Sequence, residues 1–554
     1  MVEQAGSGAQ GQLLELERRP EEAAPSPRAL SREELKLRQP NRRQRVFTTV
    51  DVERLVGDDD VVRAVWALTQ ELDLNAFAAG VASERGQPGR PAWDPRVLAA
   101  VWIWAFSQGL TSAREIERQS RWRPQLQWLL GMEVVNHHTL SDFRAGHEAA
   151  LDQALTRVLA LLSGEGLVDL AAVAVDGTRV RAAAGGSRRR RKTIETHLAA
   201  AREAVQQLSE QAAADNAEAN QRQQAARRRA ARERLERLTA SLNELEREEG
   251  KQNKARKSNA QKTRADKKRV SSQQEPSANQ KADAKAPRVS ETEPEARLQR
   301  EPNGGYSAGY NAQLATDAKE RIIVGVKLTN SASDAGQLLP ALGDVERRIG
   351  SPQTVLADEG YNSRANIAAL RQSGIAFATP APGRENQSLA AARAAGIAKG
   401  FEAKFFIYDE ASDSFRCPAN ETLEYRRSSR KRGRQYRQYQ AAGAVCGRCE
   451  QRLLCCPKSF ARGRTLSRAQ DDALMASHRA WMTTDKARAA YRKRAEVAEF
   501  PNAWLKEKMG LRKFRLRGLA KARMELLWAV LAYNVAQWAR LVWRPAQAAG
   551  AATA

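Results

Sequence analysis

The sequence predicts an α/β domain preceded by an all-α domain, and three observations support this combination. Residues 46–165 carry apolar side chains at helical spacing. A short apolar run then ends at Asp176 and Gly177, as a buried strand leading into a turn does. Beyond residue 300, strand-like runs alternate with helical stretches, which is typical of a mixed sheet covered by helices. We therefore assign 46–165 to the all-α domain, and 166–379 together with 485–542 to the α/β domain.

The chain is strongly basic. Its 554 residues include 91 Lys and Arg against 65 Asp and Glu, a formal net charge of +26, and 42% of them are hydrophobic, enough for several domains. This charge suits a polyanion, so we expect nucleic acid as a partner, although an Arg-rich chain from a GC-rich genome would carry a similar excess. There is no apolar run of about 18 residues and no signal-peptide core in residues 1–28, so we expect a cytoplasmic protein that does not enter the membrane.

The N-terminal part is predicted to be a mobile arm followed by helices. Residues 1–45 lack periodicity, which is typical of a mobile segment. In the all-α domain, Asp94 and Pro95 supply an N-cap and a first-turn proline ahead of Val97 and Leu98. A helical domain on a basic protein can present one helix to a DNA groove or can hold two copies together. Because no helix has a clear row of base-reading side chains, DNA binding and dimerisation are both open.

The first of two insertions, residues 187–300, is rich in Ala, Gln, Arg and Glu, with leucines on otherwise charged helical stretches. We expect a basic helical hairpin followed by a low-complexity tail. Its basic runs at 188–192 and 267–269 could bind phosphates, or they could simply be solvated faces.

The segment after this insertion supplies the remaining strands of the α/β domain. Residues 310–316 and 322–328 are predicted to form a β-hairpin, 354–357 a strand ending at Asp358, and 375–379 a last short strand. Helices are expected at 334–349 and 363–373. With the strand before Asp176 counted first, this order is that of a ribonuclease-H-like core.

Asp176 and Asp358 each end an apolar strand in this prediction, and the first and fourth strands of such a sheet lie side by side. The two carboxylates would therefore converge, which is unfavourable without a counter-charge. Oxygen ligands of this kind suit Mg²⁺ or Mn²⁺, and two such ions can activate the nucleophile and stabilise the leaving oxygen in phosphodiester displacement. Taken singly, each Asp is an ordinary turn residue, so only their joint placement predicts a metal site.

Several motifs resemble those of bacterial DDE-type insertion-sequence transposases, in the branch with a helical N-terminal domain and a ribonuclease-H-like catalytic core. They lie at 93–95 (WDP), 137–144 (HHTLSDFR), 175–179 (VDGTR), 309–313 (GYNAQ) and 357–361 (ADEGY), and the likeness covers most of residues 46–540. The resemblance implies an enzyme that hydrolyses phosphodiester bonds at the ends of an insertion sequence and joins the strands to target DNA with divalent metal ions. It also implies double-stranded DNA with terminal inverted repeats as substrate, a homo-oligomer on that DNA, and a place at the bacterial nucleoid.

The same family has a terminal motif in which a Glu completes the metal site and a Lys follows seven residues later. Glu499 and Lys506 fit this spacing, which is about two helical turns and could put both on one face. The resemblance therefore implies a catalytic, Mg²⁺-binding triad of Asp176, Asp358 and Glu499. Tyr491 and Arg494 also resemble this terminal motif, and basic residues beyond it could meet phosphates. The candidate DNA-binding residues are therefore Tyr491, Arg494, Lys506, Arg515 and Arg517.

The residues after Glu499 depart from the family pattern, which often has an aromatic residue and a glycine there. This chain has Phe500, Pro501, Asn502, Ala503 and Trp504 instead. Because proline is tolerated best near a helix start, we expect Glu499 at the mouth of a helix. Glu496 is a nearby alternative for the same role.

The second insertion, residues 380–484, contains all the cysteines: Cys417, Cys446, Cys449, Cys455 and Cys456. An odd, clustered set in a reducing compartment argues against a disulfide framework. The Cys446–Cys449 pair, with Cys417 and one of the last two, could complete a tetrahedral Zn²⁺ site. Reduced, partly buried thiols are the alternative.

The segment 511–542 ends in a stretch that is apolar nearly all round, including Leu526, Leu527, Trp528 and Leu531. This pattern predicts a core helix and not a membrane span. Residues 543–554 are predicted to be a mobile tail.

Two other functions fit the same sequence. The first is a metal-dependent DNA nuclease on the same core, which would cleave without joining strands. The second is a non-catalytic DNA-binding protein derived from an inactive transposase, whose action would not depend on metal.

Overall fold

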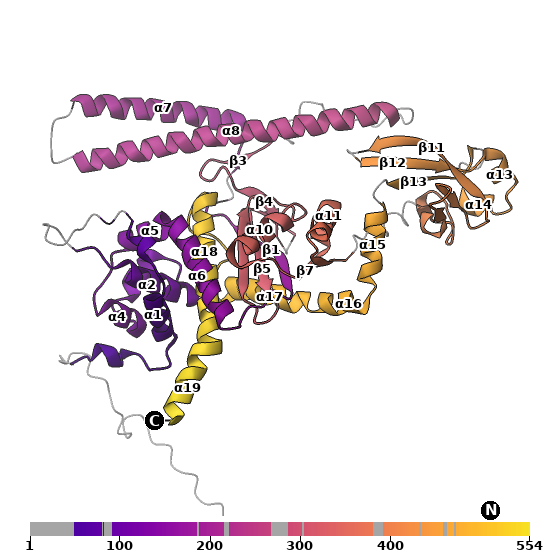
Figure 1. Cartoon of the computed structure of the whole chain (residues 1–554). Coiled ribbons are helices and arrows are strands. Elements are labelled where there is room, and N and C mark those ends of the chain that lie inside the picture. The colour runs from indigo at the N-terminus through magenta and orange to yellow at the C-terminus, as the bar shows by residue number, and fades with distance from the viewer. Residues whose placement is uncertain are drawn as a thin grey trace, which may run out of the picture. The chain divides into compact units, whose positions relative to one another are not determined.

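The computed structural model is shown in Figure 1, coloured from indigo at the N-terminus to yellow at the C-terminus. It describes residues 49–79, 81, 91–185, 188–214, 221–266, 286–301, 304–380, 392–431, 434–457, 462–469 and 472–553. The predicted N-terminal arm and the basic run at 267–269 lie outside the described residues.

The N-terminal part of the described chain is helical, as its periodicity predicts. Its α-helices are α1 (Val61–Glu71), α2 (Pro95–Ser107), α3 (Ala113–Gln119), α4 (Pro124–Leu130), α5 (His137–Gly146) and α6 (Glu148–Gly164). The Asp94 carboxylate caps α2 by accepting a hydrogen bond from the backbone nitrogen of Arg96 at 2.8 Å, and Pro95 occupies the first turn. Residues 98–106 of α2 are all buried, so this helix lies inside the helical part.

A mixed β-sheet follows. Its strands are β1 (Val173–Arg181), β4 (Arg297–Arg300), β5 (Tyr306–Asp317), β6 (Ile323–Thr329), β7 (Thr354–Ala357) and β8 (Ala376–Ala378). β5 is antiparallel to β1, β4 and β6, whereas β7 is parallel to β1 and to β8. The order β6-β5-β1-β7-β8 is that of the ribonuclease-H-like core expected from the sequence. β4 was not expected, because Leu298 is the one apolar residue among its four.

Two helices connect the strands of this sheet. α10 (Leu338–Ile349) lies between β6 and β7 in the chain, and α11 (Arg364–Gln372) lies between β7 and β8. α10 buries Leu338, Leu342 and Val345, and contacts β5 and β6. Both helices occur where the sequence predicts them.

Between β1 and β4 the chain forms a helical hairpin. Its helices are α7 (Arg191–Ala214) and α8 (Gln221–Asp266), and the short strands β2 (Arg188–Arg189) and β3 (Val289–Ser290) pair at its base. The ion pair of Arg191 with Glu249, at 2.8 Å, shows that the helices run antiparallel. A narrow apolar seam joins them and consists of Ile194, Leu198, Ala201, Leu238, Leu245 and Val289.

A second, separate sheet lies in the cysteine-containing part of the chain. Its strands are β9 (Ile407–Asp409), β10 (Ser414–Arg416), β11 (Thr422–Lys431), β12 (Arg434–Gln440) and β13 (Thr465–Ala469), in the order β13-β12-β11-β10-β9. The short helices α13 (Gly443–Arg448) and α14 (Arg452–Cys455) follow β12. We call residues 407–469, as far as they are described, the cysteine module. The sequence did not predict its sheet.

The C-terminal part is again helical. Its helices are α15 (Asp472–Met482), α16 (Asp485–Arg492), α17 (Arg494–Ala503), the π-helical turn η7 (Trp504–Lys508), α18 (Leu519–Trp538), the π-helical turn η8 (Ala539–Trp543) and α19 (Arg544–Thr553). Residues 543–554, predicted above as a tail, thus include the helix α19. Among the described residues, no helix has the length and apolar character that crossing a membrane requires.

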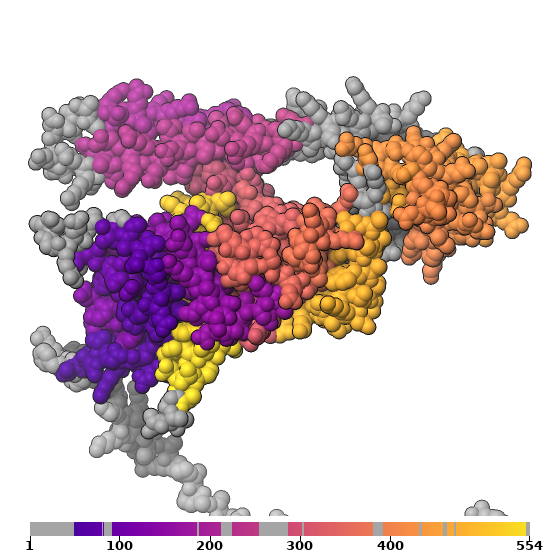
Figure 2. Space-filling model, in the orientation of Figure 1, coloured from indigo at the N-terminus to yellow at the C-terminus, as the bar shows by residue number. Residues whose placement is uncertain are grey.

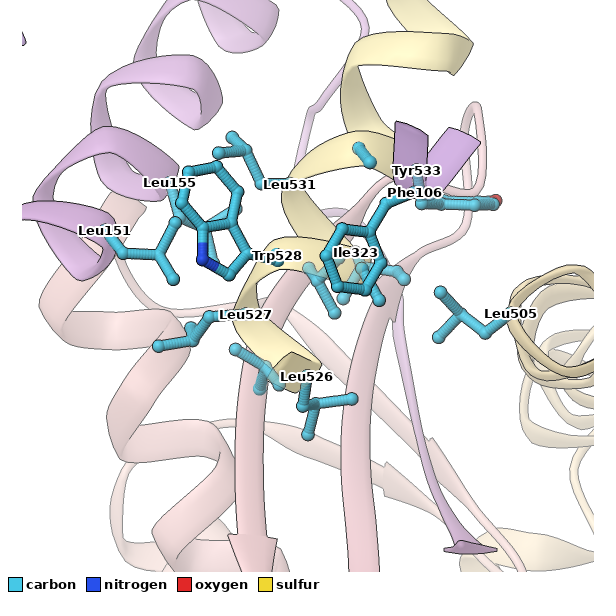
Figure 3. Packing of buried hydrophobic residues seen from close by; sticks show 14 of the residues in the cluster. Phe106, Leu151, Leu155, Ile323, Leu505, Leu526, Leu527, Trp528, Leu531 and Tyr533 are labelled. Atoms are coloured by element: carbon cyan, nitrogen blue, oxygen red, sulfur yellow. The ribbon is translucent and has the colours of Figure 1, made fainter. Parts of the chain in front are cut away.

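α18 joins the helical part and the sheet into one hydrophobic core. It contacts α2, α5 and α6 as well as β6. Figure 3 shows Trp528 of this helix beside Leu151 and Leu155 of α6, with Phe106 of α2 and Ile323 of β6 on its other side. On the face drawn in Figure 2, the yellow atoms of the segment from α18 to α19 are visible mainly at its two ends, because neighbouring elements cover the rest. The prediction of a core helix is confirmed.

Candidate active site

Asp176 lies in β1 at the point where the pairing with β7 ends. Val175 is paired with Ala357, the last residue of β7, and Asp358 follows directly. The expectation that Asp176 ends its own strand is wrong, because β1 stays paired with β5 as far as Arg181. Only the parallel pairing with β7 stops there, and this places the two aspartates side by side.

α17 brings two side chains to Asp176. Arg494 Nη2 donates a hydrogen bond to Asp176 Oδ1 at 2.7 Å, and Asn502 Nδ2 donates one to Oδ2 at 2.8 Å. The side chains of Asp176 and Arg494 are 17% and 16% exposed. Burial raises the pKa of Asp176 to about 6, Arg494 opposes this rise, and the nearby Asp358 and Asp334 carboxylates add to it. A single arginine therefore does not offset the negative charge gathered here.

Asp334 is a third carboxylate at this place, and the sequence did not predict it. It precedes α10, and its Oδ1 accepts hydrogen bonds from Asn311 Nδ2 at 2.6 Å and from Gln313 Nε2 at 2.8 Å. The Tyr361 hydroxyl donates a hydrogen bond to Gln313 Oε1. Asn311 and Gln313 are buried in β5, where alternate residues face the same side of the sheet. Two amides at alternate positions of an apolar strand were a signal that a buried polar partner lies opposite.

Glu499 lies in the middle of α17 and is exposed. No hydrogen bond links it to the two aspartates within the described residues. The expectation that it stands at a helix start is wrong, because Pro501 occupies the end of α17, where the wider turn η7 follows. The alternative residue, Glu496, is exposed as well and forms an ion pair with Arg321.

A hollow opens beside the carboxylates. It is lined by residues 177–181 of β1, Asp334, Asp358, Lys506 and Arg512, among others. Burial lowers the pKa of Lys506 and the charge of Arg512 lowers it further, whereas the Asp176 carboxylate opposes this change. Carboxylates and cations thus face the same space, a combination that suits a divalent cation together with a phosphodiester.

The predicted DNA-binding residues have different surroundings. Arg494 is held by Asp176, and Lys506 lines the hollow. Tyr491 is half-buried in a small apolar cluster, Arg515 Nε donates to Thr111 Oγ1 at 2.7 Å, and Arg517 is exposed. The structure therefore brings Arg494 and Lys506 to the aspartates or the hollow, and places the other three elsewhere.

The oxygen ligands at Asp176 fit a hard divalent cation, although they are not arranged around one. In the described part of the chain, no three His, Cys, Asp or Glu side chains form a group that could hold a metal ion. Both oxygens of Asp176 are bonded to α17, and Glu499 points to solvent. However, Asp358 is adjacent, and Asn502 Oδ1 is buried without a hydrogen-bond partner among the described residues. Carboxylate and amide oxygens are ligands of Mg²⁺ and similar ions.

Comparison with protein families gives two matches. Residues 169–535 match the family described as Transposase DDE domain, and residues 50–146 match the one described as Transposase domain (DUF772). No curated protein and no solved structure matches the chain. The first match spans well over half of the chain and includes β1, the hollow and α17. The chain therefore belongs to the DDE transposases, enzymes of the polynucleotidyl-transferase and endonuclease type with a ribonuclease-H-like core.

Proposed function

We propose that this transposase hydrolyses the phosphodiester bonds at the ends of its own insertion sequence and joins the freed 3′ ends to target DNA, with Asp176, Asp358 and Glu499 as catalytic metal ligands. The observation that carries this assignment is the register of β1 and β7, which sets Asp176 beside Asp358. Asp358 lines a hollow that also receives Lys506 and Arg512, and Gly177, the residue after Asp176, lines it as well.

DDE transposases generally use divalent metal ions, and Mg²⁺ or Mn²⁺ fits the oxygen ligands of this site. When bound, such a pair of ions activates the attacking water or 3′ hydroxyl and stabilises the leaving oxygen. Asp176 and Asp358 hold the ions in this proposal, which requires Arg494 and Asn502 to release the Asp176 carboxylate. Arg494 is then free to bind a DNA phosphate through its planar guanidinium group.

Glu499 supplies the third carboxylate in this proposal. It precedes Asn502 by three residues and therefore lies about 60° from it around the helix. A partial rotation of α17 is enough to exchange Asn502 for Glu499 beside Asp176. Release of Arg494 and Asn502 removes two hydrogen bonds that fix the present rotation of α17, and the packing of Val497 and Ala498 has to adjust as well.

The proposed substrate is double-stranded DNA, both the terminal inverted repeats and the target. The net charge of +26 supports it, because neutralising phosphates releases counterions and strengthens binding. Lys506 provides a cation at the hollow itself. Two DNA ends have to be held together for joining, so we propose a homo-oligomer on DNA, with the helices α1–α6 serving either DNA binding or dimerisation.

The proposal is tested by measuring Mg²⁺-dependent cleavage and strand transfer on DNA carrying the element's own ends. The wild-type protein should cut and join, whereas Asp176→Ala, Asp358→Ala and Glu499→Ala should bind this DNA in a gel-shift assay without cutting it. Glu496→Ala is the matched control on the same helix and should stay active, because its carboxylate pairs with Arg321.

Each other outcome overturns part of the proposal. Cleavage without joining would make the protein a nuclease. Metal-independent binding without cleavage would make it a non-catalytic DNA-binding protein. An active Glu499→Ala beside an inactive Glu496→Ala would move the third carboxylate to Glu496.

Gly177→Ala should slow cleavage, because Gly177 has no room for a side chain. A Cβ atom there would lie 2.5 Å from both Asp334 Oδ1 and Gln313 Nε2, and 3.0 Å from Asn311 Oδ1. These three side chains are linked by hydrogen bonds, so the added methyl group would displace Asp334 together with its partners. We expect about 10- to 100-fold slower cleavage and a loss of about 1–3 kcal/mol in the free energy of unfolding.

Gly185→Ala is the control for this change, because a Cβ atom at Gly185 meets no other atom within 4 Å. It should cleave at the wild-type rate. If a folded Gly177→Ala also cleaves at the wild-type rate, the close packing around Asp334 has no part in catalysis.

A further inference from the structure

All five cysteines of the chain lie at one small cavity of the cysteine module. They come from three segments and are Cys417 after β10, Cys446 and Cys449 at α13, and Cys455 and Cys456 at the end of α14. They are free thiols, four of them half-buried and Cys456 buried. Sulfur atoms from three separate segments of the chain therefore meet at one cavity. Cysteines that only fill a hydrophobic core do not need to cluster in this way.

The thiols are close enough to affect one another. All five line the same cavity, together with Arg464. Several thiolates cannot form side by side here unless a cation lies among them.

Backbone N–H groups donate to two of the sulfur atoms. Glu421 N donates to Cys417 Sγ at 3.3 Å, and Arg464 N donates to Cys446 Sγ at 3.3 Å. Hydrogen bonds of this kind orient ligand atoms and stabilise negative charge on sulfur, as the partners behind metal ligands do. Backbone N–H groups can therefore stabilise a thiolate at Cys417 and another at Cys446.

The cysteine module also lacks a large hydrophobic core. Its buried apolar cluster consists of Leu423, Tyr439, Ala441 and Leu466, together with Phe406 just before β9. Beside the cavity, Leu453 and Leu454 of α14 are 63% and 50% exposed. A unit this small usually needs a disulfide or a structural metal to be stable. The cysteines are free thiols, so no disulfide stabilises the module, and a metal ion is the other means of stabilising it.

We propose that the cysteine module binds one structural zinc ion through Cys417, Cys446, Cys449 and Cys455. Cys446 and Cys449 have the two-residue spacing that zinc ligands commonly have. Of the adjacent pair, Cys455 is half-buried and Cys456 is buried, so the more accessible Cys455 is the fourth ligand. Cys456 is the fifth thiol at the cavity and is 3% exposed.

Binding requires the four sulfurs to approach the ion to about 2.3 Å in a tetrahedral arrangement. As placed, they do not yet form such a group within the described residues. α13 and α14 are short helices at the surface, so small shifts of both close the site. Four Zn–S bonds form, and the four thiol protons pass to solvent. No electron is transferred, so the site is structural and not redox-active.

The test is the zinc content of the purified full-length chain, measured by mass spectrometry of the metals. We expect about one zinc per chain, as a four-thiolate site binds one ion. Cys417→Ser and Cys446→Ser should each lower the zinc content at least tenfold, and Cys456→Ser, the matched control, should keep it. A chain without zinc, or a Cys446→Ser variant with full zinc, overturns the proposal.

Co²⁺ titration of the chelator-treated wild-type chain gives a second measurement that does not depend on whether the variants fold. Visible absorption typical of tetrahedral Co²⁺ with a sulfur charge-transfer band supports the site, and an octahedral spectrum overturns it. If Cys456→Ser loses the metal and Cys455→Ser keeps it, the proposed ligand set is wrong. Because these measurements do not involve cleavage, their outcome is independent of the transposase chemistry.

Discussion

Asp176→Asn is expected to abolish DNA cleavage while making the fold more stable at neutral pH. The substitution removes a metal ligand and also a buried negative charge that Arg494 does not fully compensate. A pKa raised from 3.8 to about 6 corresponds to a cost of about 3 kcal/mol for keeping this carboxylate ionised in the folded protein. Part of that gain is lost with the Arg494 ion pair, so we expect the free energy of unfolding to rise by about 1–2 kcal/mol.

The sign of this effect depends on pH. In the folded protein the Asp176 carboxyl holds its proton up to about pH 6, whereas in the unfolded chain it loses the proton near pH 4. Its contribution to stability is therefore fully present below about pH 4 and is lost as the pH rises to about 6. Asp176→Asn should remove this part of the pH dependence, so its stabilisation should be seen at pH 7.5 and should vanish at pH 4.

Thermal unfolding at both pH values in the absence of divalent metal measures this effect. Asp358→Asn is the matched control, because among the described residues no ion pair links its carboxylate to α17, whereas Asp176 is paired with Arg494. It should also abolish cleavage but should change the stability less. If Asp176→Asn unfolds at a lower temperature than the wild type at pH 7.5, the carboxylate is a net support of the fold and the charge argument fails.

Glu525→Ala should give the largest loss of stability in the molecule. Glu525 of α18 is fully buried, and its carboxylate accepts hydrogen bonds from the backbone nitrogens of Arg515 and Leu516, each at 2.9 Å. Its charge also acts on Arg144, which is buried, lies over the Trp102 ring and donates to a backbone oxygen. Truncation leaves two backbone donors without their acceptor and the buried Arg144 without a nearby negative charge. Removing a buried charge partner of this kind costs about 3–5 kcal/mol.

Urea unfolding followed by circular dichroism measures this loss. Glu525→Gln keeps an acceptor oxygen and should be destabilised less than Glu525→Ala. Glu507→Ala is the control, because Glu507 forms an ion pair with Arg512 in which both side chains are more than half exposed. Such a pair contributes only about 0–1 kcal/mol. Equal unfolding midpoints for Glu525→Ala and Glu507→Ala would falsify the assignment of Glu525 as a buried anchor.

Most strands of the ribonuclease-H-like sheet could be predicted because they contain a run of apolar residues. β7, for example, is a buried run followed at once by Asp358. The sheet of the cysteine module could not be predicted in this way. β11 and β12 consist largely of Arg, Tyr, Gln and Ser, and the strands pair through their backbones with few buried side chains. Strands of this composition show little alternation of apolar and polar residues, so hydrophobic periodicity cannot predict them.

The candidate site was predicted in part, for a similar reason. Asp176 and Asp358 are marked by the strands they adjoin, whereas Asp334 precedes α10 without any local pattern and is identified only by its bonds to β5. Glu499 rested on resemblance, which fixes a position in the chain but not the direction of a side chain. Arg494 was predicted to contact DNA, and its bond to Asp176 arises from tertiary packing that spacing along one helix cannot reveal.

The position of α18 in the chain has a consequence for synthesis in the cell. This helix fills the space between α2, α6 and β6, yet residues 379–518 are translated between β8 and its first turn. A ribosome adds about 5–20 residues per second, so the earlier elements wait for several seconds with their apolar faces uncovered. A chain that stops before α18 leaves uncovered the apolar faces that this helix contacts on α2, α6 and β6. We expect such a fragment to be a target for chaperones and proteases, because its apolar surface stays exposed.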